Sequence, residues 1–109
     1  MIVTTGTQPT VAAKRATSVT PIVMALSGDA VGTGLIGSLA RPGGNVTGLT
    51  YIATELAGKR LEILKEILPR LSRVSVLWNP EDPPRVLEYK EAESAAKTLG
   101  LVLQSVEIR

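Results

Sequence analysis

Apolar residues along this 109-residue chain fall into two patterns that alternate from one end to the other. Short runs rich in Val, Ile and Leu, bounded by Gly, Pro or Asn, predict buried strands at residues 2–5, 21–26, 46–50, 73–78 and 101–108. Segments with apolar residues three or four positions apart predict amphipathic helices at residues 7–16, 30–40, 55–68 and 83–99. This order predicts an α/β fold with parallel-sheet layers built from alternating strands and helices.

The predicted helix at residues 30–40 contains a glycine pattern with two interpretations. Gly32, Gly34 and Gly37 match the G-x-G-x-x-G fingerprint of dinucleotide-binding folds, in which the first glycine lies at the turn between strand and helix. Here Asp29 already provides the helix N-cap. We therefore expect the glycines to lie inside the helix, where they permit close packing. A nucleotide-binding α/β enzyme domain that uses these glycines is the alternative.

Composition removes several kinds of chemistry. The chain has no His and no Cys, and its 12 Lys and Arg and 10 Asp and Glu are scattered, with a formal charge of +2. Nucleic-acid binding requires a basic face or stripe, so we expect no nucleic-acid partner. Without His or Cys, thiol nucleophiles, histidine bases and the commonest zinc ligands are excluded. The acidic residues between positions 81 and 93 fit a solvated helix surface. We expect no enzyme activity, no metal and no cofactor.

Polar residues directly follow three of the predicted strands: Thr5-Gly6-Thr7, Gly28-Asp29 and Asn79. Ligands of open α/β sheets bind beyond the carboxyl ends of the strands. At Thr5-Gly6-Thr7, hydroxyls beside the free amides of a helix N-terminus suit an anion. The Asp29 carboxylate suits an ammonium or a hydroxyl. The Asn79 side-chain amide offers both a donor and an acceptor. Each has a local alternative: a tight turn at Gly6, a plain N-cap at Asp29 and a turn start at Asn79.

Longer stretches of the sequence follow the order of one known family. These stretches are Thr4–Thr7, Ala12–Lys14, Pro21–Val23, Gly28–Leu35, Ser38–Gly48, Gly58–Lys65 and Val76–Pro80. Together they resemble the ABC-transporter substrate-binding proteins of the tryptophan/tyrosine type, which have a type I periplasmic-binding-protein fold. The run from Ser38 to Gly48 is quite specific. One departure is Ala30, where the family commonly has Pro.

The resemblance implies that the chain is a central fragment of a longer protein. Family members begin with a secretion or lipoprotein signal and fold into two α/β lobes that close on a small ligand at a hinged cleft. By this resemblance, residues 1–50 form the C-terminal part of lobe one with the crossover, and residues 51–109 form the N-terminal part of lobe two. We expect the full-length parent in the periplasm or another extracytoplasmic location, and the signal peptide to be absent from this chain.

The resemblance also implies a function and a site. The parent would be the extracytoplasmic solute-binding component of an ABC importer, which hands a small molecule, such as an aromatic amino acid, to a permease. The implied ligand-binding residues are Thr5, Gly6, Thr7, Gly28, Asp29 and Asn79. The lobes would close about a crossover that contains Gly48 and Thr50.

The chain of 109 residues by itself has two further structural alternatives. Its five predicted strands could close into one flavodoxin-like sheet without a cleft, as a purely structural α/β fragment. Alternatively, two half-lobes with exposed sheet edges could pair or swap between chains. We therefore expect the chain to self-associate as a dimer or a swapped oligomer.

Overall fold

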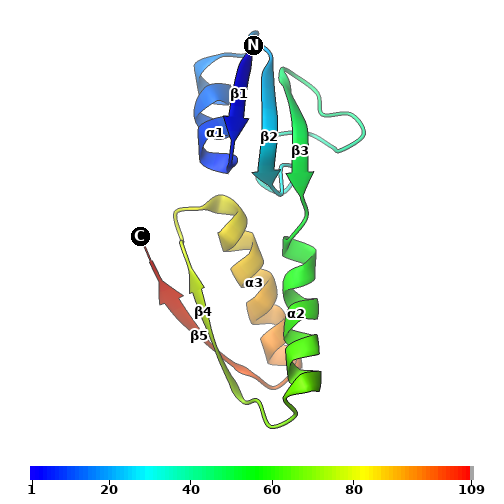
Figure 1. Ribbon diagram of the computed structural model, residues 1–109, viewed down its shortest axis with the longest axis vertical. Coiled ribbons are helices and arrows are strands. Elements are labelled where there is room, and N and C mark those ends of the chain that lie inside the picture. Colours follow the sequence, from blue (N-terminus) through cyan, green and yellow to red (C-terminus); the bar gives the residue numbers. More distant parts are fainter. Residues whose placement is uncertain (109) are drawn as a thin grey trace. The chain divides into compact units, whose positions relative to one another are not determined.

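A computed structural model describes residues 1–108 (Figure 1). In chain order, its elements are β1 (Ile2–Thr5), α1 (Thr7–Ala16), β2 (Ile22–Gly28), β3 (Val46–Tyr51), α2 (Thr54–Ile67), β4 (Arg73–Trp78), α3 (Pro83–Thr98) and β5 (Val102–Glu107). The chain divides into two compact units, which we name unit 1, residues 1–52, and unit 2, from residue 53 onward. Every strand pairing in the two units is parallel, and this confirms the predicted α/β class.

Unit 1 is built on a sheet with the strand order β1-β2-β3 (Figure 1). In the central strand, Ile22 pairs with Ile2 on one side and Val46 on the other. The central strand of a parallel sheet is buried on both faces, and Ile22 and Met24 are accordingly 0% and 1% exposed. Helix α1 connects β1 to β2 and packs Val11 against this core. All three strands run the same way, so their carboxyl ends meet at one edge of the sheet.

The prediction of a helix at residues 30–40 is wrong, because the connection between β2 and β3 forms turns. The amides of Leu35 and Ile36 both donate to Ala30 O, at 2.9 and 3.0 Å, instead of following a regular helical ladder. Gly34 has a φ of 72°, a left-handed conformation that ends the first turn. Each glycine disfavours a helix by about 1 kcal/mol relative to Ala. The apolar spacing that indicated a helix instead places Leu35 and Ile36 in the core of unit 1.

Unit 2 has a sheet of two strands, β4 and β5, in register from Arg73 opposite Val102 to Trp78 opposite Glu107 (Figure 1). Helices α2 and α3 pack against each other, and both bury small residues, Ala57 and Gly58 in α2 and Ala92 and Ala96 in α3. The buried core of this unit consists of Ala57, Leu61, Ala92, Ala96 and Leu101. Within residues 1–108, no helix combines the length and the apolarity needed to cross a membrane.

The alternative of a single five-stranded sheet is also wrong, since the described strands form separate sheets of three and two strands. A smaller difference lies at the end of β2. The strand was expected to end near residue 26, but it continues to Gly28, because Ser27 and Gly28 pair with Thr50 and Tyr51 of β3. The residues before Asp29 are therefore part of the sheet edge and not part of a free loop.

Candidate functional site

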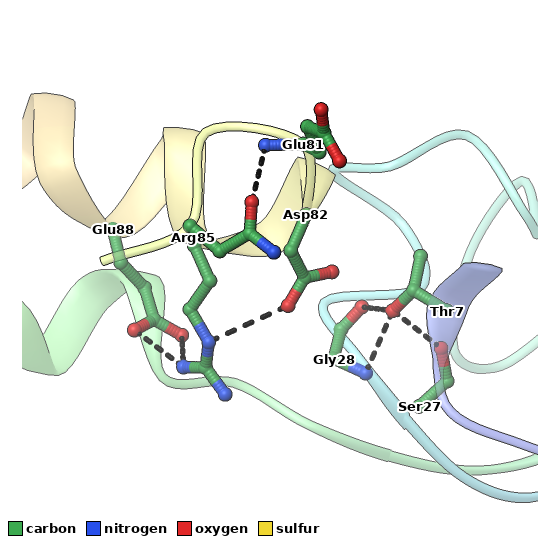
Figure 2. A network of polar contacts seen from close by, with 8 residues as sticks. Thr7, Ser27, Gly28, Glu81, Asp82, Arg85 and Glu88 are labelled. Atoms are coloured by element: carbon green, nitrogen blue, oxygen red, sulfur yellow. Dashed lines mark hydrogen bonds and ion pairs between the residues drawn. The ribbon is translucent and has the colours of Figure 1, made fainter. Parts of the chain in front are cut away.

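Thr7 joins the carboxyl ends of β1 and β2 through its hydroxyl (Figure 2). The Thr7 Oγ1 atom lies 3.1 Å from Ser27 Oγ and 3.4 Å from Gly28 O, and it accepts a hydrogen bond from Gly28 N at 3.3 Å. Thr7 and Ser27 are only 5% and 1% exposed. The structure thus brings together two predicted site residues: Thr7, which is the first residue of α1, and Gly28.

Gly6 and Thr5 lie beside this contact. The Gly6 amide donates to Leu26 O at 2.8 Å, which continues the β1–β2 ladder by one residue, and no side chain among residues 1–108 caps the start of α1. Thr5 pairs with Leu26 and has an exposed side chain. Gly6 has a φ of 89°, which agrees with the tight turn that we considered there, and Thr5 is exposed at the carboxyl end of β1.

Asp29 directly follows β2 and adopts a φ of 33°. Its carboxylate Oδ1 accepts from Gly32 N at 2.9 Å, and its carbonyl accepts from the Thr33 amide and hydroxyl at 2.9 and 2.8 Å. The capping bond that we expected at Asp29 is present, but it closes a turn and not a helix. A Cβ atom at Gly32 would overlap the Asp29 carboxylate, so a larger residue there would force the carboxylate to shift.

Thr50 brings the end of β3 into the same cluster. Its Oγ1 atom donates to Ser27 O and accepts from Ala30 N, both at 3.0 Å. The Asp29 amide donates to Tyr51 O at 3.0 Å. The turn that carries Asp29 is therefore bonded to β3 through two successive amides, those of Asp29 and Ala30.

Gly48, which was predicted to lie at the crossover, is in the interior of β3, opposite Met24. Its φ of 137° is a conformation that L-residues rarely adopt, and a Cβ atom would overlap the backbone of Met24. The pairing of β2 with β3 changes register just beyond this point. Gly48 therefore permits a close approach of two strands.

The glycine fingerprint lacks the structure that a dinucleotide site requires. No helix begins in the described segment between β2 and β3, so Gly32, Gly34 and Gly37 do not precede the helix N-terminus on which a pyrophosphate would lie. The expectation that these glycines permit packing inside a helix is wrong for the same reason. The nucleotide-binding alternative therefore has no structural support in this segment.

Asn79 directly follows β4 in unit 2, and its side chain is engaged locally. The Asn79 Oδ1 atom accepts from Glu81 N at 2.8 Å, and Asn79 O accepts from Asp82 N at 3.2 Å. This is the turn start that we considered for Asn79. At the start of α3, Arg85 Nη1 lies 2.7 Å from both carboxylate oxygens of Glu88, and Arg85 Nε lies 3.6 Å from Asp82 Oδ2 (Figure 2).

Unit 2 also contains an open cavity of about 370 Å³ between α2, β4 and α3. Trp78 and Tyr89 form part of its wall and stack in parallel, with their ring centroids 4.4 Å apart. The indole Nε1 donates to Ser105 Oγ at 2.8 Å. Most other lining residues are aliphatic, among them Leu61 and Leu64. The half-buried Trp78 ring thus packs one face against Tyr89.

Two hydroxyl residues of the unit 1 edge were not predicted, Ser27 and Thr10. Thr10 is 0% exposed, and its Oγ1 atom donates to Gly6 O at 2.8 Å and lies 2.7 Å from Thr4 Oγ1. Buried polar groups are almost always hydrogen-bonded. A Ser in the otherwise apolar strand at residues 22–28 therefore indicated a buried hydroxyl with a partner, and this signal could have identified Ser27. Among the described residues, no group of three or more His, Cys, Asp and Glu could hold a metal ion.

Comparison with known proteins identifies the family. The family model for ABC transporter substrate binding proteins matches residues 1–109. A curated relative, the tyrosine-binding protein of Clostridioides difficile strain R20291, is 33% identical over 87 residues, which are 79% of this chain and 24% of the relative.

Two solved structures are similar over nearly the whole chain. A conserved domain protein from Vibrio cholerae has a TM-score of 0.87 and 31% identity, and the match covers 97% of this chain and 35% of that one. An ABC domain from Streptococcus pneumoniae in complex with L-Trp has a TM-score of 0.84 and 25% identity, over 99% of this chain and 36% of that one. The chain thus spans between a quarter and about a third of the length of these proteins. Since the family model matches every residue, the chain belongs to the ABC-transporter substrate-binding protein family.

Proposed function

We propose that this chain is part of the solute-binding component of an ABC importer and that unit 1 contributes polar groups to its ligand site. One observation carries the proposal: the carboxyl ends of three adjacent parallel strands gather Thr7, Asp29 and Thr50 at one sheet edge. Open α/β sheets bind their ligands beyond such an edge. The names of two similar proteins, which mention tyrosine and L-Trp, support an aromatic amino acid as the ligand class.

The groups at this edge match the two charged ends of an amino acid. The Asp29 carboxylate would accept from the ligand ammonium. The first amides of α1, beginning at Thr7, would donate to the ligand carboxylate, favoured by the positive end of the helix dipole. Thr5, Gly6 and Gly28 line the same edge, where an exposed hydroxyl and two residues without a side chain leave room for a ligand.

For the full-length parent, we propose that residues 1–50 complete lobe one and that residues 51–109 begin lobe two. The ligand would be held in a cleft between the lobes, with Asn79 as the contribution of lobe two. Gly48 and Thr50, which the sequence placed at the crossover, lie in β3, so the hinge about which the cleft closes would be the chain that leaves this strand. The bonds that Thr50 makes to Ser27 and Ala30 would then connect the end of β3, from which the hinge starts, to the turn that carries Asp29.

The partners follow from the same proposal. We propose that the parent delivers its ligand to an ABC permease and that it lies in the periplasm or another extracytoplasmic location, as the match to the substrate-binding family supports. We propose no catalytic step, since the family is one of substrate-binding proteins. We propose no nucleic-acid partner, because the scattered charges form no basic stripe.

The outer strands of both sheets have one side that pairs with no other described strand, and we propose that the chain self-associates through such strands. Among the described strands, β4 pairs only with β5, and the cavity beside it is lined mainly by aliphatic and aromatic side chains. Such an edge is a template for pairing with another chain. Light scattering should give a mass above 11.5 kDa, the mass of one chain. A monomer at high concentration would contradict self-association and leave the ligand proposal intact.

Isothermal titration calorimetry tests the ligand proposal. The chain is titrated with millimolar L-tryptophan, L-tyrosine and a panel of other amino acids, and we expect weak, saturable heat for the aromatic members. Asp29→Asn should abolish that heat, because the neutral amide loses its attraction to an ammonium. Asp82→Asn, which removes a carboxylate from unit 2, is the matched control and should leave binding unchanged. No heat with any amino acid, or equal heat for Asp29→Asn, would contradict the proposal.

A further inference from the structure

Lys14, in the last turn of α1, contacts a segment far away in the sequence. Its Nζ atom lies 2.9 Å from Gly34 O and 2.9 Å from Leu35 O, both in the turn segment between β2 and β3. An ammonium has three donors and no acceptor, so one lysine can hold two carbonyls at once. We name this pair of hydrogen bonds the lysine clasp.

The clasp holds one end of the segment that carries Asp29, and β3 holds the other end. At the β3 end, the Ala30 amide donates to Thr50 Oγ1 at 3.0 Å, and the Asp29 amide donates to Tyr51 O at 3.0 Å. At the far end, the carbonyls of residues 34 and 35 accept from Lys14. The turn is therefore fixed at both ends by residues outside it.

The orientation of the Asp29 carboxylate depends on the geometry between these two anchors. The carboxylate accepts from Gly32 N at 2.9 Å, and the Asp29 carbonyl accepts from Thr33 N at 2.9 Å. There is no space between the carboxylate and the Gly32 backbone, since even a Cβ atom would overlap it. A displacement of Gly34 would be transmitted through Thr33 to Gly32, and the carboxylate would lose its fixed position.

The buried side chains of the segment do not fix this geometry alone. Leu35 and Ile36 are 3% and 7% exposed and anchor the segment to the core. Gly34 has no side chain to anchor it and lies in an exposed position. The Gly34 amide donates to Val31 O at 2.9 Å within the segment, and the clasp restrains the Gly34 carbonyl from outside it.

We propose that Lys14 is a positioning residue of the ligand site: it fixes the turn so that the Asp29 carboxylate is held ready for a ligand ammonium. This inference rests on the proposed function of Asp29. A binding site whose competent state is only partly populated loses apparent affinity in proportion to that fraction. Removal of the clasp should therefore weaken binding without removing any group that touches the ligand.

Unit 2 offers a matched control. Lys65 also donates its ammonium to a backbone carbonyl, that of Leu71, beyond the end of α2. Lys14→Met and Lys65→Met each remove one ammonium and keep a long apolar stem. The experiment uses the whole chain, with calorimetry against L-tryptophan and hydrogen exchange of individual amides. Lys14→Arg is included because a guanidinium can donate again to the two carbonyls.

In Lys14→Met we expect the amides of Gly32, Leu35 and Ile36 to exchange faster. The affinity for L-tryptophan should fall roughly tenfold, as expected when the binding-competent turn is populated about one tenth of the time. Exchange in β2 should stay unchanged. Lys65→Met should alter neither quantity, and Lys14→Arg should recover part of both. Faster exchange with unchanged affinity, or unchanged exchange in Lys14→Met, would overturn the positioning role alone. Absence of binding by the unaltered chain would overturn the proposed function together with it.

Discussion

Unit 1 and unit 2 are both built from parallel strands and helices, yet their strand ends are held in different ways. In unit 1, Thr7 reaches Gly28 and Thr50 reaches Ala30, across 21 and 20 residues of sequence. In unit 2, Asn79 bonds to Glu81, two residues away, and Arg85 pairs with Glu88, three residues away. Long-range bonds connect the residues that follow the strands of unit 1, whereas the residues that follow β4 make local bonds that shape a turn. The end of β4 itself is joined to β5 by the bond from Trp78 Nε1 to Ser105 Oγ, across 27 residues.

This difference shows why position after a strand is not enough to identify a binding site. Asp29 and Asn79 both directly follow a strand, but only Asp29 lies in a segment fixed by two neighbouring elements. A preorganised site avoids the ordering cost that a flexible one meets on binding. We therefore regard unit 1 as the main source of ligand contacts within this chain.

The largest expected effect comes from Gly48→Ala. The added Cβ atom would overlap the Met24 backbone at a φ of 137°, so β2 and β3 would separate. We expect unit 1 to lose about 4 kcal/mol of unfolding free energy, measured by hydrogen exchange of β2 amides. The single tryptophan, Trp78, lies in unit 2, and its fluorescence should remain native.

Gly37→Ala is the control for this change, because a Cβ atom there would make only an ordinary contact, 3.6 Å from Pro42 O. Its unfolding free energy should stay within about 0.5 kcal/mol of the unaltered chain. Equal stability of Gly48→Ala and Gly37→Ala would mean that β2 and β3 do not approach as described.

The next largest effect is expected for Thr7→Val, which keeps the shape of the side chain and removes the hydroxyl. The buried Gly28 amide would lose its acceptor, at a cost of about 2 kcal/mol. Thr5→Val, at an exposed position, should have little effect. Denaturant titration gives the unfolding free energy of both variants, and hydrogen exchange of the Gly28 amide reports on the lost bond. Similar stabilities of Thr7→Val and Thr5→Val would show that the Thr7 bonds do not hold the strand ends together.

A smaller effect is expected for Asn79→Ala in unit 2. The variant loses one local hydrogen bond to the Glu81 amide, at a partly exposed position, so the unfolding free energy should fall by about 0.5–1 kcal/mol. Asn79→Asp keeps an acceptor and should recover most of this loss. Trp78 fluorescence in urea measures the change. A loss as large as that of Thr7→Val would remove the contrast between the two units.

The smallest effect is expected for Lys59→Met on α2. A hydrogen bond from Lys59 to Glu62 and the charge of Glu62 raise the pKa of Lys59 above its ordinary value of 10.5, although the side chain is exposed. A raised folded-state pKa gives a stabilisation that is fully present below pH 10.5 and is lost as the pH rises through the folded-state pKa. Solvent screening keeps this stabilisation small. Urea midpoints of both proteins should converge above that pH, and a difference that grows there would refute the assignment.

The sequence predicted the fold class and nearly all elements because most segments carry an unambiguous period. Residues 73–78 alternate strictly in burial as a strand, and the apolar stripe of residues 55–68 matches α2. The segment at residues 30–40 was misassigned, since its apolar spacing fits a helix while its three glycines do not. Local periodicity could not show that Leu35 and Ile36 reach the core through a turn.

The candidate site was predicted in part. The strand-end rule located Thr7 and Asp29, and the structure connects both to the same sheet edge. Ser27 and Lys14 could not be located in this way, because their partners lie about 20 residues away in sequence. Only the fold determines which backbone groups a Lys in the last turn of a helix can reach.

One measurement tests the central claim most directly: a titration of the whole chain with L-tryptophan, followed through the backbone amide resonances. The account predicts saturable shifts at Thr7, Gly28 and Asp29 in unit 1, with smaller changes around Asn79. Shifts confined to the unit 2 cavity around Trp78, or no shift up to the solubility limit of the ligand, would contradict it.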